Sequence, residues 1–164
     1  MVQDSNGKFY SIVVDKLGIY DIAAIQYLYG ANSSFNSSNT TYNYTSEQPF
    51  YKTIWEGGGI DTINISSIIY GSKFNMNGGQ LSSVYFLNPD TVVDKRNWYY
   101  GNENIGLAYG ANIENPKATQ GEDLVIGNDL KNEIYGNSGN DTISGLAGND
   151  LIDGGSGDDY LNGN

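Results

Sequence analysis

Aliphatic side chains recur at every ninth position toward the end of the chain. The series runs Val125, Ile134, Ile143, Ile152 and Leu161, and the residues between its members are rich in Gly, Asn and Asp. Side chains of a β-strand alternate between its two faces, so one aliphatic residue in nine predicts a strand of about three residues that buries a single side chain. We therefore expect residues 118–164 to form a succession of short strands joined by glycine-rich turns.

The turns share this nine-residue period. Counted from Ala118, position 1 is glycine in every later repeat, position 4 is glycine except at Leu130, and position 6 is aspartate except at Asn132. Glycine allows the positive φ angles of a tight turn, and carbonyl and carboxylate oxygens are the ligands that Ca²⁺ prefers. The period resembles the nonapeptide G-G-x-G-x-D-x-U-x of RTX proteins, a calcium-binding repeat. The resemblance implies a parallel β-roll in which two nonapeptides form one coil, so that turns on the same edge are two nonapeptides apart.

Charge and composition narrow the range of partners. The chain has 164 residues, a formal net charge of −11, no Cys and no His, and residues 118–164 hold nine acidic residues and one basic residue. An acidic chain is a poor partner for nucleic acid, and no apolar run is long enough to span a membrane. The lack of Cys and His excludes disulfides, zinc sites built on those residues and triads with a histidine base. Stacked carboxylates favour a bound cation over the alternative, a metal-free array of β-hairpins with Gly/Asp turns.

The part before the repeats has a different pattern. Residues 19–29 carry apolar side chains at helical spacing and precede Gly30, which predicts a helix that ends near Tyr29. Runs of β-branched and aromatic residues between Gly, Asn and Asp predict short strands at 50–55, 61–66, 67–70, 83–87 and 105–110. The fold class expected for the chain is therefore all-β: a parallel β-roll preceded by a β-rich segment and one N-terminal helix.

Three segments upstream of the repeats resemble landmarks of the serralysin-type secreted metalloproteases. In the order of that family, they are Asp21–Asn32 (DIAAIQYLYGAN), Trp55–Thr62 (WEGGGIDT) and Glu103–Asn115 (ENIGLAYGANIEN). In the family the first segment is the last helix of the catalytic domain, and a C-terminal β-roll domain follows it. The resemblance implies three parts: the end of a catalytic domain in residues 1–30, a β-rich part in 31–117 and a truncated RTX roll in 118–164.

The resemblance also implies calcium ligands in the repeats. In the family, the earlier turn of a stacked pair offers the carbonyls of positions 1 and 3 and the side chain of position 6. The later turn offers the carbonyls of positions 2 and 4 and its own position 6. The three implied sites are Ala118, Gln120 and Asp123 with Asn137, Gly139 and Asp141; Gly127, Asp129 and Asn132 with Leu146, Gly148 and Asp150; and Gly136, Ser138 and Asp141 with Gly155, Gly157 and Asp159. Because the second has Leu130 in place of Gly and a neutral Asn132, we expect it to be the weakest, or empty.

Two further calcium sites are implied outside the repeat pairs. One is built from the WEGGGID loop and a loop before it, with the ligands Asn36, Ser38, Thr40, Glu56, Gly58, Gly59 and Asp61. The family usually has Asp where Glu56 stands and Gly where Ser38 stands. The other site joins Asn112 and Glu114 to the first repeat turn, with Thr119, Gly121 and Asp123. The alternative for WEGGGID is a glycine-rich turn between strands that holds no metal.

The zinc motif of the family, H-E-x-x-H-x-x-G-x-x-H, is absent because the chain has no His. The resemblance thus implies a non-catalytic calcium-binding domain, without zinc, that folds on Ca²⁺ outside the cell and supports the secretion and stability of an extracellular bacterial zinc metalloendopeptidase. Its implied partners are calcium ions, the catalytic domain of the parent chain and the type I secretion machinery. The alternative is a calcium-dependent module of an adhesin or surface-layer protein that binds carbohydrate or protein through a Tyr-rich face.

We expect the 164-residue chain neither to cleave casein nor to bind stoichiometric zinc, because it offers no imidazole or thiolate ligand. A fluorescent-casein assay and metal analysis of the purified chain measure both properties. Proteolysis that survives repurification and is blocked by a zinc chelator would contradict the prediction.

Overall fold

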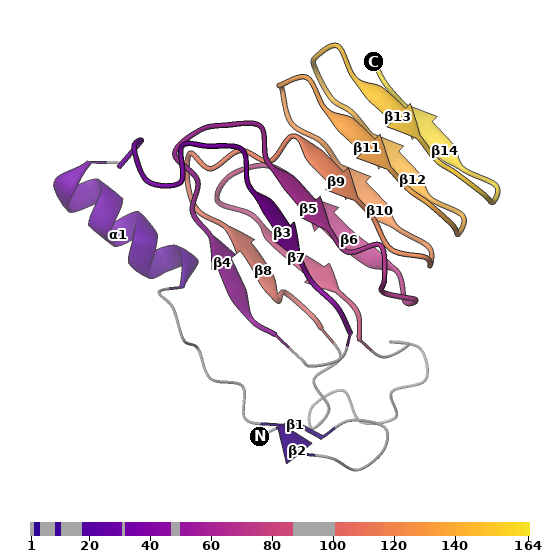
Figure 1. Ribbon diagram of the computed structural model, residues 1–164, viewed down its shortest axis with the longest axis horizontal. Coiled ribbons are helices and arrows are strands. Elements are labelled where there is room, and N and C mark those ends of the chain that lie inside the picture. The colour runs from indigo at the N-terminus through magenta and orange to yellow at the C-terminus, as the bar shows by residue number, and fades with distance from the viewer. Residues whose placement is uncertain (1, 4–8, 11–17, 31, 47–49, 87–100) are drawn as a thin grey trace.

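The computed structural model describes residues 2–3, 9–10, 18–30, 32–46, 50–86 and 101–164 (Figure 1). Within these ranges it consists mainly of short strands, with a single helix. In chain order the elements are β1 (Val2–Gln3), β2 (Phe9–Tyr10), α1 (Ile19–Tyr29), β3 (Thr41–Asn43), β4 (Lys52–Ile54), β5 (Thr62–Asn64), β6 (Ser72–Asn75), β7 (Leu81–Val84), β8 (Ile105–Leu107), β9 (Asn115–Lys117), β10 (Leu124–Ile126), β11 (Glu133–Tyr135), β12 (Thr142–Ser144), β13 (Leu151–Asp153) and β14 (Tyr160–Asn162).

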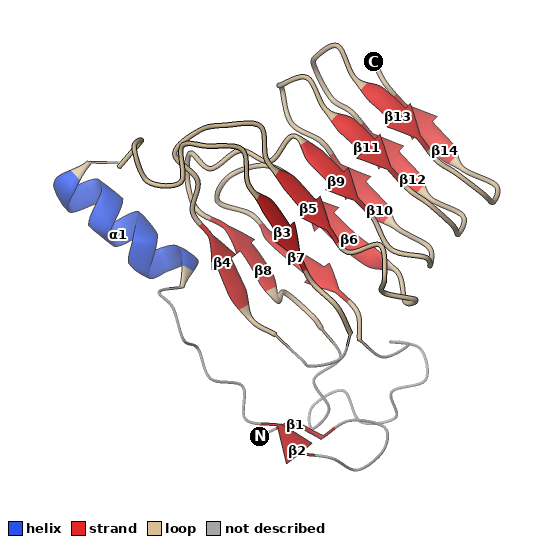
Figure 2. Ribbon diagram, viewed as in Figure 1, coloured by secondary structure: helices blue, strands red, loops and turns tan. Residues whose placement is uncertain are grey.

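Most strands form two sheets that face each other across the core (Figure 2). One sheet has seven strands in the order β14-β12-β10-β6-β7-β8-β4, and the other has five in the order β13-β11-β9-β5-β3. Strands β1 and β2 form a separate antiparallel pair. The helix lies at one end of the stack and the last coil of the chain at the other (Figure 1).

Pairing within the repeats is parallel and advances by two nonapeptides at each step. Val125 of β10 pairs with Ile143 of β12, which in turn pairs with Leu161 of β14. In the other sheet, Ile134 of β11 pairs with Ile152 of β13. The parallel β-roll implied by the RTX resemblance is therefore confirmed, together with its register.

The roll continues upstream of the repeats, where the sequence has no such period. Strands β3, β5 and β9 extend the five-stranded sheet in parallel, with Ile63 between Tyr42 and Pro116. In the seven-stranded sheet β10 pairs in parallel with β6, which begins an antiparallel run through β7 to β8, and β4 pairs in parallel with β8. The repeats are thus built onto sheets that the preceding part has already started.

One of the five strand predictions upstream of the repeats is wrong. At 67–70 the chain turns instead, because the Ile68 N–H donates to Ile65 O at 3.0 Å. This turn buries Ile68 completely and leaves Ile69 exposed. The other four segments overlap β4, β5, β7 and β8, although residue 87, at the end of the fourth, lies outside the described residues.

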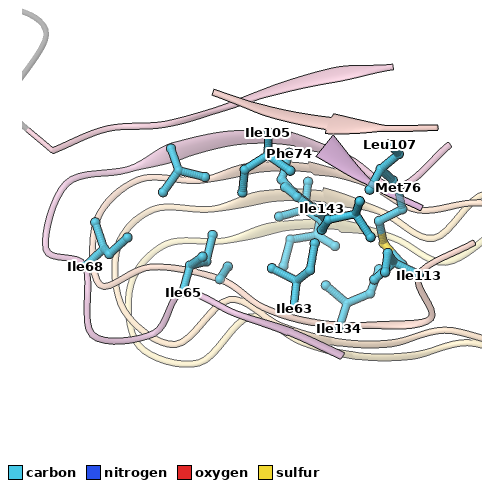
Figure 3. Packing of buried hydrophobic residues seen from close by; sticks show 14 residues of the cluster. Ile63, Ile65, Ile68, Phe74, Met76, Ile105, Leu107, Ile113, Ile134 and Ile143 are labelled. Atoms are coloured by element: carbon cyan, nitrogen blue, oxygen red, sulfur yellow. The ribbon is translucent and has the colours of Figure 1, made fainter. Parts of the chain in front are cut away.

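The hydrophobic core lies between the two sheets (Figure 3). In the repeats the middle residue of each inner strand enters it, so that Val125, Ile134 and Ile143 are fully buried. The upstream part supplies the other members of this cluster: Ile54, Ile63, Ile65, Ile68, Phe74, Met76, Val84, Ile105, Leu107, Ile113 and Ala118. Burying one aliphatic side chain contributes about 1.5–3 kcal/mol, so a repeat with one such residue needs further stabilisation from its turn.

The predicted helix is confirmed at Ile19–Tyr29 and ends at Gly30, whose φ is 81°. At its start the Gly18 N–H donates to Asp21 Oδ2 at 3.0 Å, which supplies a partner for a backbone group that the helix itself leaves free. One face packs on the roll through Ile22, which joins a small buried cluster with two alanines of the 108–111 turn. No helix in the described part of the chain is long and apolar enough to cross a membrane.

The location of the core predicts a large loss of stability when one isoleucine is replaced by alanine and a small change when another is. Because Ile63 is fully buried, Ile63→Ala should lower the free energy of unfolding by about 2–5 kcal/mol. Ile69 is 62% exposed, so Ile69→Ala should change it by less than about 0.5 kcal/mol. Urea denaturation at a fixed calcium concentration measures both values, and equal effects would contradict the packing described above.

Candidate metal sites in the stacked turns

The parallel register stacks the repeat turns in two columns, one along each edge of the roll (Figure 2). The first edge carries the turns 118–123, 136–141 and 154–159, and the second edge carries 127–132 and 145–150. Within each column the side chain at position 6 binds the turn before it. The backbone N–H of Asp123 donates to Asp141 Oδ1 at 2.8 Å, that of Asp141 to Asp159 Oδ1 at 3.0 Å, and that of Asn132 to Asp150 Oδ1 at 2.9 Å.

The second oxygen of two of these carboxylates is buried and has no hydrogen-bond partner, at Asp141 Oδ2 and Asp150 Oδ2. Each lies over the first glycine of its own turn, because a Cβ atom at Gly136 or Gly145 would lie against it. Burial raises the pKa of Asp141, the N–H of Asp123 opposes the rise, and the charges of Asp159 and Glu122 add to it. A buried carboxylate oxygen without a partner is costly, so these two atoms mark places where a cation fits.

The backbone of the last three repeats is left-handed at positions 2 and 4. The φ angles are 74° at Asn137, 121° at Gly139, 68° at Leu146, 137° at Gly148, 93° at Gly155 and 136° at Gly157. Glycine adopts this region freely, whereas leucine does so at a cost of roughly 1–2 kcal/mol. Because such strain persists only where the surroundings impose it, the turn conformation is a property of the stacked column and does not depend on glycine alone.

The position-6 side chains of the first two repeats are hydrogen-bonded. Asp123 accepts bonds from Ser72 Oγ at 2.6 Å and from Thr119 through both its backbone N–H at 2.9 Å and its Oγ1 at 2.8 Å. Burial raises the pKa of Asp123 to about 6, although the hydrogen bonds from Ser72 and Thr119 oppose the rise. On the second edge, Asn132 Oδ1 accepts the Asn128 N–H at 3.1 Å, and its Nδ2 donates to Asn128 Oδ1 at 2.9 Å.

Three buried carboxylates, those of Glu56, Asp61 and Glu114, lie in the same region upstream of the repeats. Both side-chain oxygens of Glu56 are buried without a hydrogen-bond partner. Burial raises the pKa of Glu56 to about 7, and the negative charges of Asp61 and Glu114 add to the rise. Asp61 Oδ1 accepts the Thr40 N–H at 2.7 Å, and the Asp61 N–H donates to Glu114 Oε2 at 2.7 Å.

The loop that precedes β3, which carries Asn36, Ser38 and Thr40, lies against this acidic group. Asn36 Nδ2 donates to Trp55 O at 3.4 Å. A Cβ atom at Gly59 would lie 2.9 Å from Ser38 O, so the two loops approach through their backbones. The structure therefore places Ser38 beside Gly59 and Thr40 beside Asp61, four of the residues predicted for the WEGGGID site.

The expected pairing of Glu114 with the first repeat turn differs from the structure. Because Thr62 of β5 pairs with Asn115 of β9, the residues just before them, Asp61 and Glu114, lie side by side. The Asp123 carboxylate takes its hydrogen bonds from Ser72 and Thr119 instead. Asn112 is exposed. The sequence carries no signal for the meeting of Glu114 and Asp61, because it depends on the pairing of strands that are distant in the chain.

Among the described residues, no three or more His, Cys, Asp or Glu side chains converge as a metal-ligating group. A cation at these turns would therefore draw most of its ligands from backbone carbonyls. Such a donor set, with one or two carboxylates, suits Ca²⁺, which takes six to eight oxygen ligands in flexible geometry. It does not suit Zn²⁺, which prefers nitrogen and sulfur ligands in a tetrahedron.

The strain at Leu146 can be tested. Because φ is 68° there, Leu146→Gly should raise the free energy of unfolding by about 0.5–1 kcal/mol in the presence of calcium. The matched control is Leu130→Gly at position 4 of a repeat whose backbone is not left-handed, and it should lower that free energy by about 0.5–1 kcal/mol. Urea denaturation compares the two, and the same sign for both would contradict the strain.

Known proteins carry the same kind of glycine- and aspartate-rich repeat as these turns. Residues 135–164 match the RTX calcium-binding nonapeptide repeat in four copies. The chain is 36% identical over 128 residues to metallopeptidase AprA of Pseudomonas marginalis, covering 71% of this chain and 24% of the relative. It is 37% identical over 124 residues to metalloprotease AprA of Pseudomonas entomophila, covering 68% and 23%. With serralysin of Photorhabdus laumondii it shares 33% identity over 126 residues, covering 70% and 23%.

The chain thus spans about a quarter of the length of the curated relatives it matches. Its last part carries the repeat of the calcium-binding RTX proteins, and its parallel strands form the β-roll that this repeat implies. The chain is therefore a calcium-binding RTX β-roll similar to the serralysin-type metalloproteases, as expected of a serralysin-type C-terminal RTX domain.

Proposed function

We propose that this chain is the calcium-binding domain of a secreted bacterial serralysin-type zinc metalloprotease, that it folds on Ca²⁺ outside the cell, and that it is itself non-catalytic. The observation that carries the proposal is the unpartnered, buried oxygen at position 6 of turns that stack along both edges, at Asp141 and Asp150. Bound calcium would supply positive charge between carboxylates that otherwise repel one another. The matches to RTX repeats and to serralysins support this reading.

The calcium ligands follow from where unpartnered oxygens and left-handed turns coincide. On the first edge we assign them to the turns 136–141 and 154–159, and they are Gly136, Ser138, Asp141, Gly155, Gly157 and Asp159. On the second edge Asp150 contributes, with the carbonyls of Leu146 and Gly148. Upstream, Glu56 and Asp61 hold an ion with the carbonyls of Asn36, Ser38, Thr40, Gly58 and Gly59. Glu114 neighbours the same group through Asp61.

Calcium bound at these sites would make the stability of the domain depend on the calcium concentration around it. Sites of extracellular modules have Kd values of about 10⁻⁴–10⁻³ M. At roughly 10 mM Ca²⁺ and a Kd near 1 mM, each site adds about 1.4 kcal/mol to the free energy of unfolding. The domain would then be unstable in a calcium-poor cytosol and ordered outside the cell, which suits export of an unfolded chain by a type I secretion system.

The remaining roles belong to the parent protein. We assign residues 1–30 to the end of its catalytic domain, residues 31–117 to the β-rich part of the C-terminal domain and residues 118–164 to the RTX roll. The catalytic domain is then the structural partner of this chain, and the zinc-dependent hydrolysis lies outside it. The lack of His in this chain supports its catalytic silence.

A second candidate function is a calcium-dependent binding module of an adhesin or surface-layer protein. It is favoured by a shallow polar groove on the outer face of the five-stranded sheet, lined by Thr62, Asn115, Lys117, Glu133, Tyr135 and Asn137. An aromatic ring beside amide and charged groups is a surface on which a sugar ring packs. Calcium-dependent binding of the isolated chain to a glycan array would favour this module, and an H-E-x-x-H motif upstream in the parent would favour the protease.

Chelation of calcium tests the proposed function. Removing Ca²⁺ should abolish the hydrogen-exchange protection of the Ser156 and Tyr160 amides, which donate to Asn137 O at 2.8 Å and to Asp141 O at 2.7 Å and so join two of the assigned turns. Added Ca²⁺ should restore the protection. Mg²⁺ at the same concentration should not, because it demands a smaller octahedral site and retains its waters. Protection that is indifferent to the chelator would show that the turns do not need the metal.

A further inference from the structure

The five repeats use two kinds of turn. In the last three, positions 2 and 4 are left-handed. In the first two, the corresponding residues Thr119, Gly121, Asn128 and Leu130 all stay outside that region. The change falls between the first and the second coil of the roll, although the nine-residue period runs through it without a gap.

The backbone conformation at position 2 determines whether its N–H donates a hydrogen bond to the position-6 side chain of the same turn. In the first coil the position-2 N–H donates to that side chain, from Thr119 to Asp123 Oδ2 at 2.9 Å and from Asn128 to Asn132 Oδ1 at 3.1 Å. In the turns 136–141 and 145–150, position 6 keeps a buried oxygen without a partner, at Asp141 Oδ2 and Asp150 Oδ2. In the first coil, hydrogen bonds therefore occupy the side-chain oxygen that the second coil leaves without a partner.

On the first edge the sequence gives a physical reason for the closure. Position 2 is Thr119, and a β-branched residue is a genuine outlier at positive φ. Its hydroxyl also donates to the Asp123 carboxylate, at 2.8 Å. A second hydroxyl reaches the same carboxylate from β6, where Ser72 Oγ lies 2.6 Å from Asp123 Oδ1. Asp123 is 3% exposed, so these bonds replace its hydration.

The carbonyl oxygens of the first coil are also engaged. Ala118 O, an expected ligand at position 1, accepts a hydrogen bond from Asn137 Nδ2 at 2.8 Å. On the second edge Gly127 O likewise accepts one from Asn77 Nδ2 at 2.8 Å. An amide N–H group thus lies against oxygen atoms that an ion would need to approach.

We propose that the turn 118–123 takes no calcium ion, and that the first repeat ion on this edge is held by the turns 136–141 and 154–159. Asn132 and Asn128 close the second edge in a parallel way. The inference rests on the proposed function, because it requires that the later turns bind calcium. It departs from the ligand set that the repeat resemblance implies, in which Asp123 shares an ion with Asp141.

Counting bound calcium in the full chain tests this proposal. After equilibrium dialysis against calcium, with folding checked by circular dichroism, metal analysis should find the same number of ions in D123N as in the unchanged chain. D141N should hold at least one ion fewer. A loss in D123N equal to that in D141N would overturn the proposal and leave the proposed function intact. No bound calcium in the unchanged chain would overturn both.

A second set of variants covers the case in which D123N folds poorly. The variant S72A/A118G/T119G places glycine at positions 1 and 2 of the first repeat and removes the hydroxyl from β6. It should free the Asp123 carboxylate and add one calcium ion per chain. The control S72A alone keeps Thr119 and should leave the number unchanged. If the triple variant gains no ion, the hydrogen bonds of Thr119 and Ser72 are not what excludes calcium, and the proposal fails.

Discussion

The rest of this roll depends on the stacking of its repeat turns in register. Parallel strands lie about 4.8 Å apart, so an acidic residue at a fixed position of each repeat comes to lie beside its counterpart in the next coil. At position 8 each repeat adds at most one well-buried aliphatic side chain to offset that repulsion. Three features offset this repulsion. A backbone N–H donates to one oxygen of each of the later carboxylates, and hydroxyl or amide groups bind the position-6 side chains of the first coil. In the second coil, unpartnered oxygens leave positions that suit a cation.

The two halves of the structure therefore differ in what holds them together. The upstream part has a large core around Ile63 and Phe74, contributed by strands of both sheets. The last coil has little of this, because Ile152 is only partly buried and Leu161 is 45% exposed. Along the roll, the main source of stability thus changes from apolar packing in the upstream part to the interactions made within the turns of the repeats. Thr119 and Ser72 stand at this boundary, where the packed sheets of the upstream part meet the repeats.

The sequence predicts the repeat half well because its information is local and periodic. One aliphatic residue in nine predicts the short strands, and the resemblance of the period to the RTX nonapeptide implies the pairing of Val125 with Ile143 and the two columns of position-6 side chains. It predicts the upstream half less well. The apolar run at 67–70 has the composition of a strand, yet it turns so that Ile68 can enter the core. Glu114 and Asp61 meet only through a strand pairing that no short-range pattern encodes.

The hydrogen bonds that the position-6 carboxylates accept from the neighbouring coil all run the same way. A carboxylate of the later coil accepts the N–H of the earlier one, as Asp159 does from Asp141, so each coil is completed by its successor. The roll therefore has a polarity, like a helix or a filament with unlike ends. In a solenoid of this kind, the position-6 N–H of a coil gains its carboxylate partner only when the next coil is in place.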